Sequence, residues 1–321
     1  MPRLPRQLCG FLLLATLALA GCGDQAGSPA PLPPSGAGQP PTALTSAGAT
    51  TALPAGTTVP TGAGDAFVVT AADLKAQVSD PRLRLVDMGS GDEYAAGHLP
   101  GAVHIEWSEL DLGNTQPSAV AAWQGRMSDL LGKRGIGDGD RVVVYDHGTL
   151  YGARLWWVLD QLGQADKQIL DGGFAAWQAV GGTVETKPGT LAAVTYTAHP
   201  QPADLASKAE VQAALGQANL RLLDARSPGE YAAGHIPGAV NVPFTSTADG
   251  TPLLFKSPAD LHALFTAQGV TAGTAVVTYC TTGVRGAVDY VALRRAGFPN
   301  VRLFTGSWAE WSRDPQAPVA K

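Results

Sequence analysis

The chain contains an eleven-residue segment twice, and this repeat constrains the fold more than any other feature. Glu93–Val103 reads EYAAGHLPGAV, and 137 residues later Glu230–Val240 reads EYAAGHIPGAV. Apolar runs that predict buried strands flank both copies: Leu83–Asp87 and Val142–Asp146 around the first, Leu220–Asp224 and Val276–Cys280 around the second. A period this long is not that of a solenoid. It predicts a duplicated α/β domain in which parallel strands are joined by helices.

Both copies continue in the same order after the second strand. Helices are predicted over Arg154–Leu162 and Ala287–Ala296, and each copy closes with a turn that contains glycine and tryptophan, at Gly172–Trp177 and Gly306–Trp311. Three prolines within residues 185–203 indicate a connector between the copies. We therefore expect an N-terminal domain at residues 65–186, a linker at 187–204 and a C-terminal domain at 205–315.

Residues 1–22 have the pattern of an export signal. Two arginines precede an apolar run at residues 8–20 that is too short for a comfortable membrane span. The run ends in Leu19-Ala20-Gly21-Cys22, which resembles a bacterial lipobox with Cys22 as the lipidated residue. An ordinary secretory signal is the alternative. Lipidation would anchor the protein in the cell envelope or periplasm, on a membrane without spanning it.

The stretch at residues 23–64 is rich in Pro, Gly, Ala and Thr, and Asp24 is its only charged residue. It holds too few large apolar residues to bury a core, so we expect a disordered tether. Charge is sparse elsewhere too: the formal net charge is −5 and charged residues make up 15% of the chain. With no basic stripe, nucleic-acid binding is not expected. No Cys or His pair has metal-ligand spacing, and no cofactor is predicted.

Cys280 lies where a predicted strand ends and a helix begins, the place where open α/β sheets bind ligands. The chain has three cysteines, and Cys280 alone falls in the folded part, so no internal disulfide is possible there. The backbone N–H groups of the loop that follows would stabilise a thiolate: Thr281, Thr282, Gly283, Val284 and Arg285. A small buried hydrophobic cysteine is the alternative.

These motifs together resemble a two-domain rhodanese, a sulfurtransferase. The resemblance rests on the start Asp224–Tyr231, the Gly-His-Ile-Pro-Gly-Ala turn, the Cys-x-x-Gly-x-Arg loop and the terminal Gly-x-Trp-x-x-Trp, and it covers residues 67–314. It implies a catalytic second domain and an inactive first one. The first copy has Asp146, Tyr151 and Gly89 in the places of Cys280, Arg285 and Arg226. Asp146 is therefore interpreted as a strand-end residue.

The resemblance implies double displacement through a persulfide on Cys280. The donor would be thiosulfate, the acceptor cyanide or a thiol, and Arg285 and Arg226 would bind the anionic head of the donor. For Arg226, a salt bridge to Glu230 is the alternative. His98 and His235 occur in both copies, so we expect a structural role for them, as for the strand-end Asp87 and Asp224.

Three other functions need weighing. Phosphatase and arsenate-reductase loops place five residues between Cys and Arg, whereas this loop has four, which argues against both. A 3-mercaptopyruvate sulfurtransferase remains an alternative, although Arg285 stands where such loops have Thr. The third alternative is an exported, non-enzymatic persulfide carrier. The sequence fixes no oligomeric state, and a two-domain rhodanese can work as a monomer.

Overall fold

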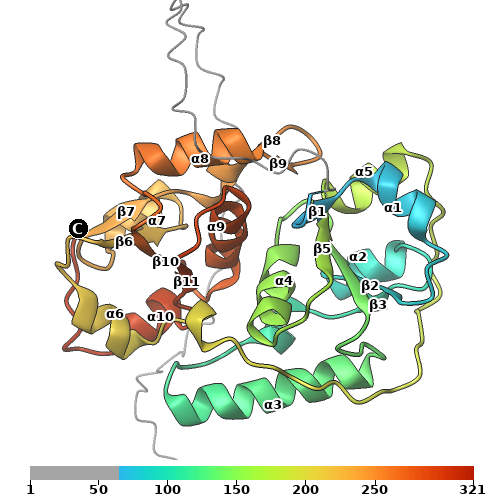
Figure 1. The fold of residues 1–321 in the computed structure, drawn as a ribbon, viewed down its shortest axis with the longest axis horizontal. Helices are drawn as coiled ribbons and strands as arrows, with labels where there is room; N and C mark the ends of the chain where they lie inside the picture. The colour runs from blue at the N-terminus through green and yellow to red at the C-terminus, as the bar shows by residue number, and fades with distance from the viewer. Residues whose placement is uncertain (1–64) are drawn as a thin grey trace, which may run out of the picture. The chain divides into compact units, whose positions relative to one another are not determined.

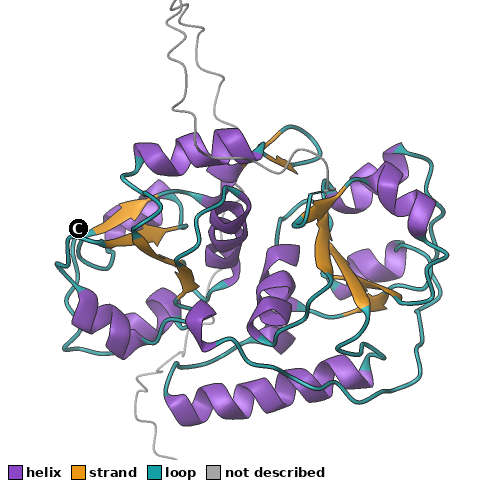
Figure 2. Cartoon of the chain, in the orientation of Figure 1, coloured by secondary structure: helices purple, strands orange, loops and turns teal. Residues whose placement is uncertain are grey.

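Strands and helices alternate through residues 65–321, the residues that this computed structural model describes (Figure 2). The signal and tether predicted at residues 1–64 lie outside the described residues. Two parallel sheets, each flanked by helices, follow one another along the chain. The predicted α/β fold with a duplicated domain is therefore confirmed.

The first domain is built on five parallel strands in the order β1-β5-β4-β2-β3 (Figure 1). These are β1 (Val68–Val69), β2 (Leu83–Asp87), β3 (Val103–His104), β4 (Arg141–Tyr145) and β5 (Lys167–Leu170). The middle strand β4 is buried from Val142 to Tyr145, as expected when helices cover both faces of a parallel sheet. Asp146 follows it directly at the carboxyl edge.

The helices of the first domain are α1 (Ala71–Gln77), α2 (Gly91–Ala96), the 3-10 turn η1 (Trp107–Leu110), α3 (Pro117–Lys133), α4 (Gly152–Gln161) and α5 (Gly173–Ala179). The start of the repeated segment is a helix with a capping box. Ser90 accepts the N–H of Glu93, whose carboxylate accepts the N–H of Ser90. The same box begins α7 (Pro228–Ala233) with Ser227 and Glu230.

The second domain repeats the sheet with four parallel strands in the order β11-β10-β6-β7. They are β6 (Leu220–Asp224), β7 (Ala239–Asn241), β10 (Ala275–Tyr279) and β11 (Val301–Leu303), and an antiparallel pair, β8 (Ala248–Asp249) and β9 (Leu254–Phe255), is added. The place of β1 is taken by a single parallel bridge between Leu205 and Leu303. Cys280 follows the central strand β10, as Asp146 follows β4.

The 3-10 turn η2 (Pro202–Asp204) precedes the second domain, whose other helices are α6 (Lys208–Ala214), the 3-10 turn η3 (Phe244–Thr247), α8 (Pro258–Ala267), α9 (Val284–Arg295) and α10 (Ser307–Trp311). Helix α9 begins three residues before the predicted start, because Gly283 is its N-cap. Arg285 therefore belongs to the first helical turn rather than to the loop. The two closing turns are also helical, as α5 and α10. Among residues 65–321, no helix combines the length and apolar character needed to cross a membrane.

Helices α4 and α9 lie side by side and carry much of the contact between the domains (Figure 1). Both are buried along most of their length, and their apolar residues belong to one core cluster with members from both domains. Tyr290 of α9 donates a hydrogen bond of 2.8 Å to the carboxylate of Asp160 in α4. At a second contact, the Glu310 carboxylate accepts the backbone N–H and the hydroxyl of Thr115. The two domains thus share polar and apolar contacts.

Candidate active site

Cys280 sits at the base of a loop that joins β10 to α9, and its side chain is buried. Gly283 has a φ of +88°, a left-handed conformation that favours glycine. This turn directs the N–H of Gly283 at the Cys280 sulfur, with N and Sγ 3.1 Å apart. The partial positive charge at the start of a helix then lies beside the sulfur. The strand-to-helix position predicted for Cys280 is the one observed.

The first residues of α10 hold the backbone of Cys280 in place. The hydroxyl of Ser307 accepts the N–H of Cys280 at 3.1 Å and donates to the carbonyl of Phe304. The N–H of Trp308 donates to the carbonyl of Cys280 at 3.0 Å. Ser307 has a φ of +53°, an uncommon conformation for serine, which surrounding contacts must hold. The terminal Gly-x-Trp motif therefore acts as a brace for the cysteine.

Most N–H groups of the predicted cradle are available to a ligand. Within residues 65–321, those of Thr281, Thr282, Val284 and Arg285 donate to no protein acceptor, and Gly283 donates to Sγ. Unsatisfied N–H groups at the start of a helix form an anion site. The loop can therefore receive one more negatively charged atom beyond Sγ.

The first domain shows this cradle filled. The Oδ1 atom of Asp146 accepts the N–H groups of Gly148, Thr149 and Leu150 at 2.8, 2.8 and 3.2 Å. Its Oδ2 atom accepts the N–H of Gly152 at 2.9 Å. In the repeat these donors correspond to residues 282, 283, 284 and 286. Asp146 is a strand-end residue, as predicted, and its carboxylate shows that a loop of this design binds a negative charge.

Arg285 does not stand free beside the sulfur. Its Nη1 donates to Glu230 Oε2 at 2.7 Å and its Nη2 to Glu230 Oε1 at 2.8 Å, while Nη2 also donates to the Thr281 hydroxyl. Hydrogen bonds from Arg285 are the main cause that lowers the pKa of Glu230 to about 2. The same bonds, and negative charge at Cys280, raise the pKa of Arg285. The guanidinium is therefore fixed near the loop, with its charge largely offset.

Arg226 pairs with a different carboxylate. Its Nε donates to Asp224 Oδ1 at 2.9 Å, its Nη2 to Asp224 Oδ2 at 2.6 Å and to the Gly234 carbonyl, and the group is buried. The guanidinium carbon lies 4.7 Å from the centroid of the Trp308 ring, and Trp308 is part of the motif that braces the cysteine. The alternative pairing of Arg226 with Glu230 is wrong, because Glu230 holds Arg285.

In the first domain another residue pairs with the strand-end aspartate. Gly89 replaces Arg226 there, and a Cβ at Gly89 would lie 2.5 Å from the ring of His147. The His147 Nε2 is 3.1 Å from the Asp87 carboxylate, in the place that the guanidinium takes in the second domain. Burial opposes protonation of His147, but the hydrogen bond and charge of Asp87 outweigh it and raise the pKa. The repeat does not reveal this exchange, because Arg226 and His147 come from different loops.

The repeated histidines lie away from any cradle and support turns. His98 and His235 stack on Tyr94 and Tyr231, with ring centroids 3.9 and 3.8 Å apart, and their Nδ1 atoms face the carbonyls of those tyrosines. Each also pairs through its backbone with an extended segment, at Glu185 and Ala320 respectively. This geometry fits the structural role expected from their presence in both copies.

Two buried groups near the site were missed by sequence reasoning. Arg154 of α4 is 1% exposed and crosses to the second domain, where it donates to the Thr305 hydroxyl. Asp289 of α9 is fully buried, and neither carboxyl oxygen has a partner in residues 65–321. Both lie within stretches that read as apolar helix, so only their charge could have attracted attention.

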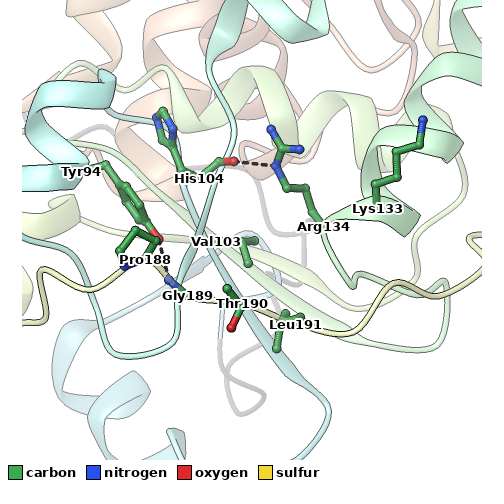
Figure 3. A pocket seen from close by; sticks show the side chains of 9 residues that line it. All are labelled: Tyr94, Val103, His104, Lys133, Arg134, Pro188, Gly189, Thr190 and Leu191. Carbon is green, nitrogen blue, oxygen red and sulfur yellow. Dashed lines mark hydrogen bonds between the residues drawn. The ribbon is translucent and has the colours of Figure 1, made fainter.

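A pocket in the first domain does not include the cradle. It lies between β3, the end of α3 and the linker (Figure 3), and its lining includes Tyr94, His104, Arg134 and Leu191. The Arg134 guanidinium there donates to the carbonyl of His104 and pairs with Glu109. Among the described residues, no cluster of His, Cys, Asp and Glu is arranged to hold a metal ion.

Comparisons with known proteins point to one family. The rhodanese-like domain matches residues 70–180 and again residues 207–314. A thiosulfate sulfurtransferase of Azotobacter vinelandii is 34% identical over 264 residues, which cover 79% of this chain and 96% of that protein. A probable 3-mercaptopyruvate sulfurtransferase of Pseudomonas aeruginosa is 36% identical over 282 residues, covering 79% and 98%. The crystal structure of the Escherichia coli 3-mercaptopyruvate sulfotransferase is 27% identical, with a TM-score of 0.65, and covers 75% of this chain and 98% of that one.

Proposed function

The chain belongs to the rhodanese family and is a sulfurtransferase, and we propose that it takes sulfane sulfur from thiosulfate onto Cys280 and passes it to cyanide or a thiol. The observation that carries this proposal is the cradle. Its first-domain copy holds the Asp146 carboxylate with four N–H groups, whereas the second domain offers these groups to a reactive sulfur.

In the proposed reaction, the Cys280 thiolate attacks the outer sulfur of thiosulfate. A new S–S bond forms, the S–S bond of thiosulfate breaks, and sulfite leaves with the electron pair. The outer sulfur of the persulfide lies one bond beyond Sγ, as Asp146 Oδ1 lies one bond beyond Cγ. The N–H groups of Thr282, Gly283, Val284 and Gly286 then stabilise its negative charge, as an oxyanion hole does. Cyanide or a thiolate takes that sulfur in the second step and Cys280 leaves as thiolate.

Two arginines are proposed contacts of the anionic head of the donor. Arg285 is held at the loop by Glu230 and is one-fifth exposed, so its outer face is open to an anion. Arg226 would act from within its buried pair with Asp224. A bidentate guanidinium suits the oxygens of the SO₃ group of thiosulfate.

A specific observation keeps 3-mercaptopyruvate as a second candidate donor. Both arginines are already paired with carboxylates. Repulsion by these carboxylates weakens the binding of a singly charged donor less than the binding of a dianion. The probable 3-mercaptopyruvate sulfurtransferase named above is also as similar to this chain as the thiosulfate enzymes are.

A matched pair of proteins tests the function: the purified full chain and its Cys280→Ser variant. Each is given thiosulfate or 3-mercaptopyruvate with cyanide, and thiocyanate and intact mass are followed. We expect thiocyanate from thiosulfate and a mass gain of one sulfur on the native protein only. Faster turnover with 3-mercaptopyruvate would reassign the donor. A persulfide without turnover would indicate a carrier, and no mass gain from either donor would overturn the proposal.

We further propose that the protein is exported and anchored to a membrane through a lipid on Cys22. Support comes from the Leu19-Ala20-Gly21-Cys22 motif and from the stretch rich in Pro, Gly, Ala and Thr that follows it. Cells expressing the native chain or Cys22→Ala would be grown with labelled palmitate. Label and membrane association should be present in the native chain and absent in the variant, and equal labelling of both would contradict the anchor.

A further inference from the structure

Arg154 is a buried cation that the first domain contributes to the neighbourhood of Cys280. It lies on α4 and is 1% exposed. Its Nη1 donates to the Thr305 hydroxyl of the second domain at 2.7 Å, and its Nη2 donates to the carbonyl of Leu110 at 2.8 Å. A buried guanidinium is costly to desolvate. Its retention at this interface therefore calls for a compensating interaction.

Thr305 connects this cation to the cysteine loop. It lies between β11 and α10 and is itself buried. A Cβ at Gly283 would be 2.9 Å from the Thr305 hydroxyl and 2.7 Å from its carbonyl oxygen, so the two residues are in direct contact. Gly283 is the residue whose N–H donates to Cys280 Sγ. One contiguous line of contacts thus runs from Arg154 through Thr305 and Gly283 to the sulfur.

The charge of Arg154 also differs from that of the other two arginines. Glu230 offsets Arg285, and Asp224 offsets Arg226. Among residues 65–321, Arg154 has no carboxylate at ion-pair distance, and its Nε has no hydrogen-bond partner. Burial lowers the pKa of Arg154 to about 10, while the negative charges of Asp111 and Cys280 oppose this lowering. The group is therefore a cation at neutral pH, on the interface that Thr305 shares with the Cys280 loop.

We infer that Arg154 of the inactive domain is a positioning residue of the active site. It holds Thr305 against the Cys280 loop, and its charge, which forms no ion pair within residues 65–321, stabilises the negatively charged sulfur across the domain interface. This inference rests on the proposed function, because it assigns the charge to the same thiolate and persulfide. The first domain then supplies part of the electrostatics of the site as well as packing.

Three variants separate the two parts of this role. Arg154→Met removes the charge at similar length, Arg154→Lys keeps it, and Thr305→Val keeps it but removes the acceptor at constant shape. Arg294→Met is the matched control. It removes another interdomain arginine, which lies 4.0 Å from Asp160 of α4, pairs with Asp204, and stands nine residues beyond Arg285 along α9. The full chain is used throughout, and its thermal midpoint is measured for each variant.

The main readout is the pH dependence of Cys280 alkylation by iodoacetamide, which reports the thiolate whatever the donor. Charged groups lie on each element packed against the loop: Arg154 on α4, Arg285 and Asp289 on α9, Glu230 on α7, Glu310 on α10, and Asp224 and Arg226 at the end of β6. For Arg154→Met we expect the midpoint to rise by about one pH unit, which is about tenfold slower alkylation below the midpoint. Arg154→Lys should restore most of this loss, and Arg294→Met should show none of it. Thr305→Val should slow persulfide loading several-fold with a smaller change in midpoint.

The outcomes are distinguishable from failure of the proposed function. If the native chain takes up no sulfur, the function fails, while the alkylation profile still tests Arg154. A folded Arg154→Met with the native profile and loading rate would overturn the inference. If Arg154→Met does not fold, Thr305→Val decides, and a native rate of persulfide loading in that variant would overturn the inference.

Discussion

Glu230 binds both Nη atoms of Arg285, at 2.7 and 2.8 Å, beside the loop that carries Cys280. The pair places a cation and an anion next to the same reactive sulfur. An incoming anionic donor is therefore attracted by one member and repelled by the other. The strength of donor binding depends on this balance. The balance can be changed by replacing one carboxylate oxygen of Glu230 with an amide nitrogen.

Glu230→Gln should lower the KM for thiosulfate about three- to tenfold, because it removes the negative charge and leaves an amide oxygen to hold Arg285. Steady-state thiocyanate formation measures this. Since the pKa of Glu230 is about 2, the carboxylate stays charged at pH 4, and the effect should persist there. Glu93→Gln, which changes the equivalent capping residue of the first domain, is the control. An unchanged or higher KM in Glu230→Gln would contradict the prediction.

Asp146→Asn should destabilise the protein without altering sulfur transfer. The Oδ2 atom of Asp146 accepts the N–H of Gly152, and an amide NH₂ in that place would face a donor with a donor. Leaving such buried groups unpaired costs on the order of 1–3 kcal/mol. Urea unfolding should show this loss while kcat stays native in the folded variant. Native stability of Asp146→Asn would show that the hydrogen bonds between the carboxylate and the cradle do not stabilise the fold.

Asp289→Leu should stabilise the protein, and more so at higher pH. Burial, and to a lesser extent the charge of Asp224, raise the pKa of Asp289 well above its usual value, and the equivalent residue of the first domain is Leu155. The unfolded chain releases this proton above about pH 4 whereas the folded chain keeps it, so the native protein loses stability as pH rises toward the folded pKa.

The gain in Asp289→Leu should therefore be smallest near pH 4 and reach on the order of 1–3 kcal/mol at pH 8. Urea unfolding at the two pH values measures it, with Asp289→Asn as the isosteric comparison. A variant that is less stable than the native protein at pH 8 would show that the carboxyl has a partner after all.

Local signals were sufficient for the fold and for the position of Cys280. The repeat placed β4 and β10 in the sheet, and the loop glycine, Gly283, has the left-handed backbone that the turn requires. Pairing of the charged residues was not predictable in this way. Glu230 is four residues from Arg226 in sequence, yet it reaches across to Arg285 on another element. Only the packing of α7 against the start of α9 decides between the two.

Arg154 was unpredictable for a related reason. It stands in a run of large apolar residues on α4, and its partner Thr305 is 151 residues away. The role of Arg154 depends on contact between the two domains, and a sequence motif within one domain gives no information about that contact. The exchange of Arg226 for His147 as the partner of the strand-end aspartate could not be predicted either, because the repeat aligns Arg226 with Gly89.

The buried pair of Arg226 and Asp224 gives the last prediction, which separates a donor contact from a structural ion pair. Arg226→Gln alone leaves the buried Asp224 charge unpaired, at a cost of about 3–5 kcal/mol, so its loss of activity would be ambiguous. The double variant Arg226→Gln/Asp224→Asn removes both charges and should recover most of that stability. If Arg226 contacts the donor, the folded double variant should have a KM for thiosulfate at least tenfold above native. Asp224→Asn alone should not raise the KM in this way. A double variant with native KM and kcat would show that Arg226 serves the fold of the loop and that Arg285 alone meets the donor.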